Sequence, residues 1–209
     1  MGVWENQVLP RVINVMLGTK EVRRYREEAV AGLHGSVVEI GFGSGLNVPY
    51  YPVEVVTVYA VDPSSVGRKL AAKRVNALSI PVEYVGLDGQ ELPLGDESVD
   101  AALSTFTLCT IPDVGRALSE LYRVLRPGGR IHFLEHGLSS DPAVANKQHR
   151  FNRFQQRFAG GCHLDRPIDS LVVEAGFEVS ALKNNWLRGP KALKPWSYLY
   201  NGVAAKPTR

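Results

Sequence analysis

The sequence predicts an α/β fold built on one mostly parallel β-sheet. Short runs rich in β-branched residues alternate with longer stretches of helical periodicity along most of the chain. A glycine-rich segment follows the first of these runs, where the backbone must turn sharply, and a helix is expected directly after it. The 209 residues suit one domain with a sizeable core. Because strands and helices alternate, helices are expected to cover both faces of the sheet.

Five strands are expected before residue 137. Each is a short apolar run that ends near a glycine, an acidic residue or a loop. The runs are Val37–Ile40, Val55–Asp62, Val82–Asp88, Val99–Phe106 and Arg130–His136. Between them, Ser64 or Ser65 is expected to cap a helix that ends at Ala77. Asp113 is expected to cap another helix, which the segment RPGG at Arg126–Gly129 stops.

The C-terminal part of the chain has a different pattern. Helices are expected at Pro142–Phe158 and Ile168–Ala175, followed by strands at Phe177–Asn184 and Ser197–Pro207. Two closing strands after a helix fit an antiparallel edge on the same sheet, which then has seven strands. With no internal repeat or linker, residues 1–209 form one domain, with a helical cap at 1–34 and a substrate-side insertion at 137–167.

Composition excludes several classes of protein. A net charge of +3 is too small to indicate nucleic-acid binding by itself. The longest run without Asp, Glu, Lys or Arg, Ile40–Val53, is shorter than the roughly 20 residues that cross a bilayer. The N-terminus does not have the pattern of a secretory signal. Cys109 and Cys162 form no CxxC pair, so neither a disulfide framework nor a structural metal site is expected, and a reducing cytoplasm is.

The segment VVEIGFGSGLN, at Val37–Asn47, predicts a nucleotide site. Its glycines are Gly41, Gly43 and Gly45. The pattern is GxGxG, because Leu46 stands where the dinucleotide pattern GxGxxG has its last glycine. Glu39 precedes the first glycine by two positions, and a carboxylate there does nothing for a pyrophosphate. It favours a cationic ligand instead, such as S-adenosylmethionine with its sulfonium and ammonium groups, and Leu46 and Glu39 together argue against a nicotinamide oxidoreductase.

Two later strand ends carry acidic residues. Asp62 lies 62 − 41 = 21 residues beyond Gly41, a spacing typical of a carboxylate that binds ribose hydroxyls. Asp88 is a candidate acceptor for an adenine amino group, and the Gly89 backbone can approach the ring. Either aspartate can also be an ordinary turn residue, because one precedes a proline and the other a glycine. All these positions lie at the carboxyl ends of parallel strands, where open α/β sheets bind ligands.

In these segments the chain resembles the class I S-adenosylmethionine-dependent methyltransferases over nearly its whole length. VVEIGFGSGLN is similar to their first motif and VDP to their ribose-binding strand end, while DGQELPLGDESVD resembles the quinone-methylating enzymes. STFTLCTI, RVLRPGG, FLEH and GGCHLDR resemble the membrane-associated alkyl thiol methyltransferases more closely. The resemblance implies a Rossmann-like fold and S-adenosyl-L-methionine as cofactor. The long hydrophobic N-terminal anchor of those relatives has no counterpart here, which favours a soluble form.

The resemblance also implies cofactor contacts at matching positions. The methionine part is expected near Gly41, Gly43, Asn47 and the Thr105 backbone. The nucleoside part is expected near Asp62, Pro63, Asp88 and Gly89. Glu39 is expected to orient the loop, which includes Gly45, and to act electrostatically.

The acceptor site is predicted from fewer signals. Methyl transfer is an in-line displacement that needs alignment and a dry pocket more than a catalytic triad. His136, at the end of the fifth strand, is the best candidate for a general base. The cluster His163, Asp165 and Arg166 either lines the pocket or pins its loop through an Asp–Arg pair.

Phe151 and Phe154 lie on an apolar helix face with Val144 and Phe158, beside a basic face. That helix is either a packing helix or a pocket lid that also touches anionic lipid or an acidic substrate.

We therefore expect an enzyme that methylates a small molecule, with a lipophilic or alkyl thiol as the favoured acceptor. The alternatives are a quinone carbon, a phenol oxygen or a phospholipid amine. A further alternative is a protein that binds S-adenosylmethionine without catalysis. The expected partners are a small-molecule substrate and, peripherally, a membrane, with no nucleic acid.

Overall fold

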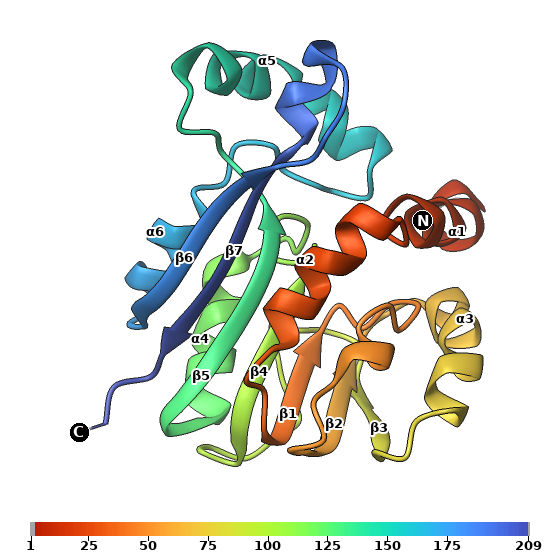
Figure 1. Cartoon of the computed structure of the whole chain (residues 1–209), viewed down its shortest axis with the longest axis vertical. Helices are drawn as coiled ribbons and strands as arrows, with labels where there is room; N and C mark the ends of the chain where they lie inside the picture. Colours follow the sequence, from red (N-terminus) through yellow and green to blue (C-terminus); the bar gives the residue numbers. More distant parts are fainter. Residues whose placement is uncertain (1–2, 209) are drawn as a thin grey trace.

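The computed structural model describes residues 3–208 and confirms the predicted sheet. Seven strands form one sheet in the order β3-β2-β1-β4-β5-β7-β6 (Figure 1). The strands are β1 (Gly35–Ile40), β2 (Val55–Val61), β3 (Val82–Gly86), β4 (Val99–Thr105), β5 (Leu125–His136), β6 (Glu178–Trp186) and β7 (Tyr198–Ala205). The predicted antiparallel pairing is confirmed at β7, which runs antiparallel to both β5 and β6. Because β7 lies between these two strands, β6 forms the edge of the sheet.

The helices begin and end close to the predicted positions. They are α1 (Leu9–Met16), α2 (Lys20–Val30), α3 (Ser65–Asn76), α4 (Val114–Val124), α5 (Pro142–Phe158) and α6 (Ile168–Glu174), with short helical turns at Trp4–Val8, Val48–Tyr50 and Lys191–Trp196. The Ser64 hydroxyl accepts a hydrogen bond of 2.9 Å from the Gly67 amide, and Asp113 caps α4 in the same way through the Arg116 amide. Both predicted caps are therefore present.

Helices cover both faces of the sheet, as the alternation of side chains along β1 requires. Val38 packs with Leu118 of α4 and Ile168 of α6 in one buried cluster. Its neighbour Val37 points to the other face and packs with Ala71 of α3. Figure 1 shows α2 crossing the sheet toward the N-terminal helix α1, which lies beyond the carboxyl ends of the strands.

The chain does not form an α-helix after the glycine-rich loop, and this prediction was wrong. Only a single turn at Val48–Tyr50 separates the loop from the segment that leads into β2. Pro49 fits the first turn of a helix, but Pro52 lacks the amide hydrogen that a continuing helix needs. The loop therefore has no α-helix N-terminus directly behind it.

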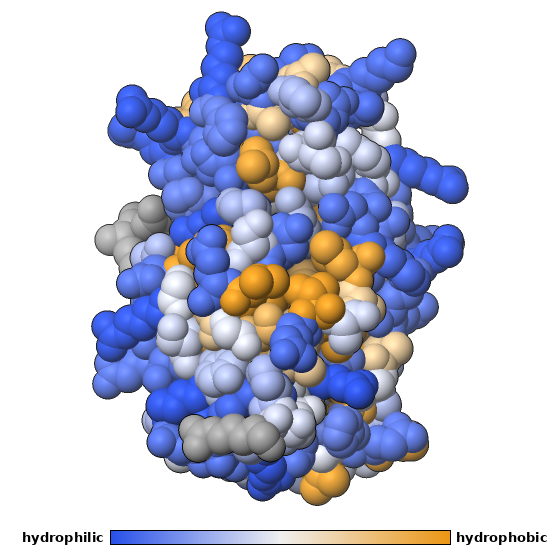
Figure 2. Space-filling view, turned by 90° about the vertical axis from the view of Figure 1, so that its left-hand side faces the viewer, coloured by the Kyte–Doolittle hydropathy of each residue, from blue (hydrophilic) through white to orange (hydrophobic). Residues whose placement is uncertain are grey.

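The edge strand β6 and helix α6 leave some apolar surface uncovered. Figure 2 shows apolar side chains gathered in the middle of this side of the molecule. Val173 and Leu182 are exposed there and line a shallow hollow. Across residues 3–208, no helix is both long enough and apolar enough to cross a membrane.

Candidate active site

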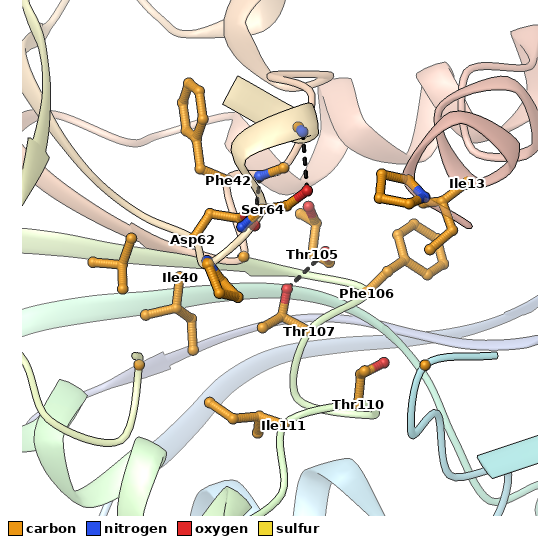
Figure 3. Close-up of a pocket in the computed structure, with 18 of the residues that line it drawn as sticks. Ile13, Ile40, Phe42, Asp62, Ser64, Thr105, Phe106, Thr107, Thr110 and Ile111 are labelled. Atoms are coloured by element: carbon orange, nitrogen blue, oxygen red, sulfur yellow. Dashed lines mark hydrogen bonds between the residues drawn. The ribbon is translucent and has the colours of Figure 1, made fainter. Parts of the chain in front are cut away.

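A cavity of about 480 Å³ opens at the carboxyl ends of the parallel strands (Figure 3). Ile40 of β1, Asp62 after β2 and Thr105 of β4 reach it from three neighbouring strands. This is the edge of an open α/β sheet where ligands bind. Most of the predicted cofactor residues line this cavity, namely Gly41, Gly43, Asn47, Asp62, Pro63, Asp88, Gly89 and Thr105.

The glycine-rich loop forms a cradle that other residues could not form. Gly41 has φ of +71°, and a Cβ there would overlap the hydroxyl of Thr107. Gly45 does not line the cavity but has φ of +68° and packs against Ala71 of α3. The positive φ angles let the backbone turn back over the strand ends, so the loop can approach a ligand closely.

Asp62 holds this loop in place. One carboxylate oxygen accepts a hydrogen bond of 2.8 Å from the Gly43 amide, and the other accepts one of 2.7 Å from the Ser64 amide. Burial raises the pKa of Asp62, while the two amide hydrogen bonds oppose that rise. Each carboxylate oxygen can accept a second hydrogen bond, so Asp62 can also bind ribose hydroxyls.

Glu39 lies buried beneath the cavity instead of lining it. One of its oxygens accepts a hydrogen bond of 2.8 Å from the side-chain amide of Asn47, and the other accepts one from the Tyr51 hydroxyl. Burial raises the pKa of Glu39 to about 7, and the hydrogen bonds from Tyr51 and Asn47 limit the rise. A cation bound above the loop therefore favours the ionised form of this carboxyl group.

Arg26 lines the same cavity and was missed by the sequence analysis. Its Nη1 atom donates hydrogen bonds of 2.8 Å to the Asn47 side-chain oxygen and 2.9 Å to the Thr105 hydroxyl. Its Nε is buried and has no hydrogen-bond partner, and burial lowers the pKa of Arg26 to about 10. Helix α2 carries several arginines, but Arg26 lies three or four positions from Val22, Ala29 and Val30 and so shares their buried helix face. Helical spacing is therefore the signal that could have found it.

These residues fit S-adenosylmethionine. The glycine cradle accommodates close approach, Asp62 can hold the ribose, and Glu39 favours a cation. The Arg26 guanidinium places a positive charge at the cavity wall, which suits the carboxylate of an amino acid.

The comparisons with known proteins agree with this fit. Residues 38–133 match a family described as a methyltransferase domain. Phosphatidylethanolamine N-methyltransferase of Cereibacter sphaeroides is 30% identical over 159 residues, which cover 75% of this chain and 77% of that protein. Thiol S-methyltransferase TMT1B of Mus musculus is 32% identical over 181 residues, which cover 84% of this chain and 73% of that protein. The chain belongs to the S-adenosylmethionine-dependent methyltransferases.

The fold of this methyltransferase is also found in solved structures. A SAM dependent methyltransferase from Aquifex aeolicus superimposes with a TM-score of 0.61 at 18% identity, covering 94% of this chain and 98% of that one. Family and fold together identify the chain as an enzyme whose cofactor is S-adenosyl-L-methionine. The predicted resemblance, the Rossmann-like fold and the cofactor are thereby confirmed.

The end of the cavity away from Asp62 is mostly apolar. Leu9, Pro10 and Ile13 of the predicted N-terminal cap line it, together with Phe106 from the loop after β4. Figure 3 shows Ile13 and Phe106 on the same side of the opening, with the hydroxyl groups of Thr107 and Thr110 below them. Gly160 and Gly161, from the predicted substrate-side insertion, complete this end.

His136 is buried and does not line the cavity of the methyltransferase. Its Nε2 lies 3.3 Å from the Pro195 carbonyl oxygen, and its Nδ1 lies 3.7 Å from the Cys162 sulfur. The ring is thus turned toward the segment behind the cavity wall.

The cluster that follows Cys162 pins the loops around the cavity and does not line it. The Arg166 guanidinium donates to the carbonyl oxygens of Leu108, Ile111 and Pro112, in the segment that joins β4 to α4. Asp165 accepts a hydrogen bond of 2.6 Å from Asn152 of α5, and His163 contacts Gln156 at 3.1 Å. Arg166 therefore holds the loop through backbone carbonyls instead of through the predicted pair with Asp165.

Helix α5 presents its aromatic residues to solvent. Its buried side chains are Val144, Gln148 and Asn152, while Phe154 is 61% exposed. Phe151 packs against Trp196, with ring centroids 5.5 Å apart. Neither Phe151 nor Phe154 lines the cavity, so their contact with substrate remains a proposal.

Proposed function

We propose that this methyltransferase transfers the methyl group of S-adenosylmethionine to the sulfur of a small, lipophilic thiol. The observation that carries the proposal is the apolar character of the end of the cavity away from Asp62, which we call the acceptor end. The end around Asp62 and Asp88 is called the nucleoside end. Among the described lining residues, the ionisable side chains are Arg26, Asp62 and Asp88, and the two aspartates stand at the nucleoside end. The acceptor end therefore offers apolar walls and hydroxyl groups, but no carboxylate, imidazole or amine to act as a general base.

A thiol is the acceptor that needs such a base least. A cysteine-like thiol has an unperturbed pKa of about 8.5, so a few per cent of it is already thiolate at neutral pH. Such a thiol is more ionised than a phenol, with a pKa near 10, and an amine with a pKa of about 10.4 must lose a proton before it can attack. An unactivated alkyl thiol is less acidic than a cysteine thiol, so its methylation should depend more strongly on pH. An apolar wall also strengthens the attraction between a thiolate and a sulfonium, because the effective dielectric constant is low there.

The chain's own residues contribute binding and alignment. Asp62 is proposed to hold the ribose, and Arg26 to hold the carboxylate of the methionine part. Ile13 and Phe106 exclude water from the acceptor end. When bound, S-adenosylmethionine supplies the methyl group itself. Since His136 faces Cys162 and Pro195, the proposal does not use it as the base.

A lipid surface is the proposed source of the acceptor. Apolar side chains near the cavity mouth are exposed, namely Trp4, Val8, Val12, Val15, Met16, Phe154 and Phe158. Trp4 donates a hydrogen bond of 3.1 Å to the Phe158 carbonyl oxygen, which joins the two helical segments that carry them. Arg11, Arg150, Arg153 and Arg157 are exposed on the same segments. Apolar and basic residues in this combination favour peripheral contact with an anionic membrane.

The same surface favours a phospholipid amine as the second candidate acceptor. The phosphatidylethanolamine N-methyltransferase relative acts on such a lipid, as its name states. The quinone carbon remains a third candidate, because DGQELPLGDESVD resembles the quinone enzymes.

A turnover panel distinguishes these acceptors. The full-length protein is incubated with labelled S-adenosylmethionine and with octanethiol, octanol, a quinol, or phosphatidylethanolamine in mixed micelles. Octanol is the matched control, because it differs from octanethiol only in the acceptor atom. The proposal expects a thioether from octanethiol, identified by mass, and no ether from octanol. Methylation of the lipid or the quinol without any thioether would contradict the thiol assignment.

A further inference from the structure

Three side chains of residue types that can bind metals converge behind the wall of the acceptor end. Cys109 follows β4, His136 ends β5 and Cys162 follows α5. Their ligand atoms all lie within 4.8 Å of one another, with Cys109 and His136 buried and Cys162 half-buried. This cluster was not predictable from the sequence, because its members come from distant segments and the two cysteines are 53 positions apart.

Two of the three separations match those of a tetrahedral metal site, and the Cys109 sulfur and His136 lie within 4.8 Å of each other. The Cys109 and Cys162 sulfurs are 3.8 Å apart, and the Cys162 sulfur is 3.7 Å from His136 Nδ1. With Zn–S bonds of about 2.3 Å and Zn–N bonds of about 2.05 Å at tetrahedral angles, neighbouring ligands lie about 3.8 Å apart for two sulfurs and about 3.6 Å for sulfur and nitrogen. Two measured separations therefore have the lengths of edges of such a tetrahedron.

The histidine ring is oriented for coordination. The Pro195 carbonyl can only accept, so the contact at 3.3 Å places the proton on His136 Nε2 and leaves the lone pair of Nδ1 toward Cys162. The same carbonyl accepts a hydrogen bond of 3.0 Å from Gln148, which fixes its position. Histidines that bind metals characteristically donate their other N–H to a carbonyl or carboxylate in this way.

We propose that Cys109, His136 and Cys162 form a binding site for Zn²⁺ or a divalent cation of similar softness. The three side chains supply three ligands and water the fourth. Binding releases the two thiol protons to solvent, and the metal takes their place between the sulfurs. A disulfide is the competing use of the pair, but its sulfurs must approach about 1.7 Å closer, to about 2.05 Å, and it gives His136 no role.

The position of the site suggests what the metal does. Gly160 and Gly161 line the acceptor end of the cavity, and Cys162 follows them directly. A metal ion would tie this loop to the segment after β4 and to the end of β5. We therefore expect metal loading to stabilise the acceptor wall while leaving the nucleoside end around Asp62 unchanged.

Metal binding is measured without turnover, so the result is independent of the proposed acceptor. Untagged full-length protein, kept reduced with a phosphine, is loaded with Zn²⁺, dialysed and analysed for bound metal. Replacement of zinc by Co²⁺ then reports the ligands through its absorption spectrum. We expect one ion per chain, intense visible bands of tetrahedral Co²⁺ and a thiolate-to-cobalt charge-transfer band.

Variants assign the site. C109S and C162S should each lose the bound ion and the charge-transfer band, while H34A, which changes an exposed histidine elsewhere, should keep both. Circular dichroism and cofactor titration check that the variants fold, and the cobalt spectrum of the wild type does not depend on any variant. The proposal is overturned if reduced wild type takes up neither metal, or if C162S binds zinc as the wild type does. Formation of a Cys109–Cys162 disulfide with no metal uptake by the reduced protein would identify a redox pair and would also overturn it.

Discussion

Arg26 donates a hydrogen bond of 2.8 Å to the side-chain oxygen of Asn47, and this contact joins helix α2 to the loop after β1. The same nitrogen donates to the Thr105 hydroxyl, so segments from three parts of the chain meet at one guanidinium group. The buried Nε of Arg26 has no partner. A buried cation at the wall of the cavity is suited to the carboxylate of the cofactor.

Replacing Arg26 by methionine should weaken cofactor binding at least tenfold. A hydrogen bond between charged groups contributes roughly 1.5–3 kcal/mol, and about 1.4 kcal/mol corresponds to a factor of ten in affinity. Calorimetric titration with S-adenosylhomocysteine measures the loss. Methylthioadenosine, which lacks the amino-acid end, should bind wild type and R26M equally. R24A is the matched control, because Arg24 lies on the same helix with its side chain 80% exposed. Equal losses for both ligands would mean that Arg26 only supports the fold.

Asp62→Ala should also reduce cofactor affinity at least tenfold, because the ribose loses a charged acceptor. Asp62 also holds the amides of Gly43 and Ser64, so a loss of affinity alone does not separate the two roles. The 2′,3′-dideoxy analogue of S-adenosylhomocysteine separates them through a double-mutant cycle. Wild type should prefer the natural ribose tenfold or more, and D62A should show no preference. A preference that persists in D62A would leave Asp62 as a residue of the turn only.

Glu39 should make cofactor affinity depend on pH. In the free protein burial raises its pKa to about 7, so the carboxyl group is largely protonated below that pH. Binding of a sulfonium and an ammonium favours the ionised form and expels the proton. The affinity for S-adenosylmethionine should therefore rise as the pH increases through 7. In E39Q that part of the pH dependence should disappear, and identical slopes in the two proteins would refute the electrostatic role.

The same group sets the sign of a stability effect. In the unfolded chain Glu39 titrates near the ordinary value of about 4.3, but in the folded protein its pKa is about 7. Its stabilising contribution is thus fully present below the unfolded value and is lost as the pH rises through the folded value. Denaturant unfolding at pH 5 and pH 8 should show a larger decrease in the free energy of unfolding for wild type than for E39Q.

Ile13→Ser should weaken acceptor binding without affecting the cofactor. Ile13 lines the apolar end of the cavity, whereas Val15 lies on the same helix, is 72% exposed and does not line it. Because each buried methylene contributes about 0.8 kcal/mol, the KM for octanethiol should rise roughly three- to tenfold in I13S. V15S is the control and should match wild type. An unchanged KM in I13S would place the acceptor elsewhere.

The order of strands and helices along the chain was predictable from local sequence signals. Strands such as Val37–Ile40 are short runs rich in β-branched residues, and Ser64 and Asp113 mark helix starts with side chains that cap them. The missing helix after Asn47 shows where this reasoning fails. The glycine loop led to an expected helix, but Pro52 removes the amide hydrogen that a longer helix requires.

The candidate site likewise contains some residues that the sequence analysis found and others that it missed. Gly41, Gly43 and Asp62 were predictable, because strand ends and backbone strain leave their mark on the local sequence. Arg26 was missed although helical spacing places it on the buried face of α2 with Val22 and Val30. The cluster around His136 was not predictable, since only tertiary packing brings its distant members together. Periodicity likewise grouped Phe151 with Phe154 but did not reveal that Gln148 and Asn152 would be the buried residues of α5.

The measurement that tests the account most directly is the pH dependence of kcat/KM for thioether formation with two thiols of different pKa. The acceptor end has no base among its described lining residues, so the thiol should supply its own ionisation. We expect a thioether product from both thiols, with a rate that rises with pH up to the pKa of each thiol. The break in the profile should therefore move when the thiol is changed. A break at the same pH for both would show that a protein group such as His136 acts as the base, and the absence of any thioether would contradict the assignment to thiols.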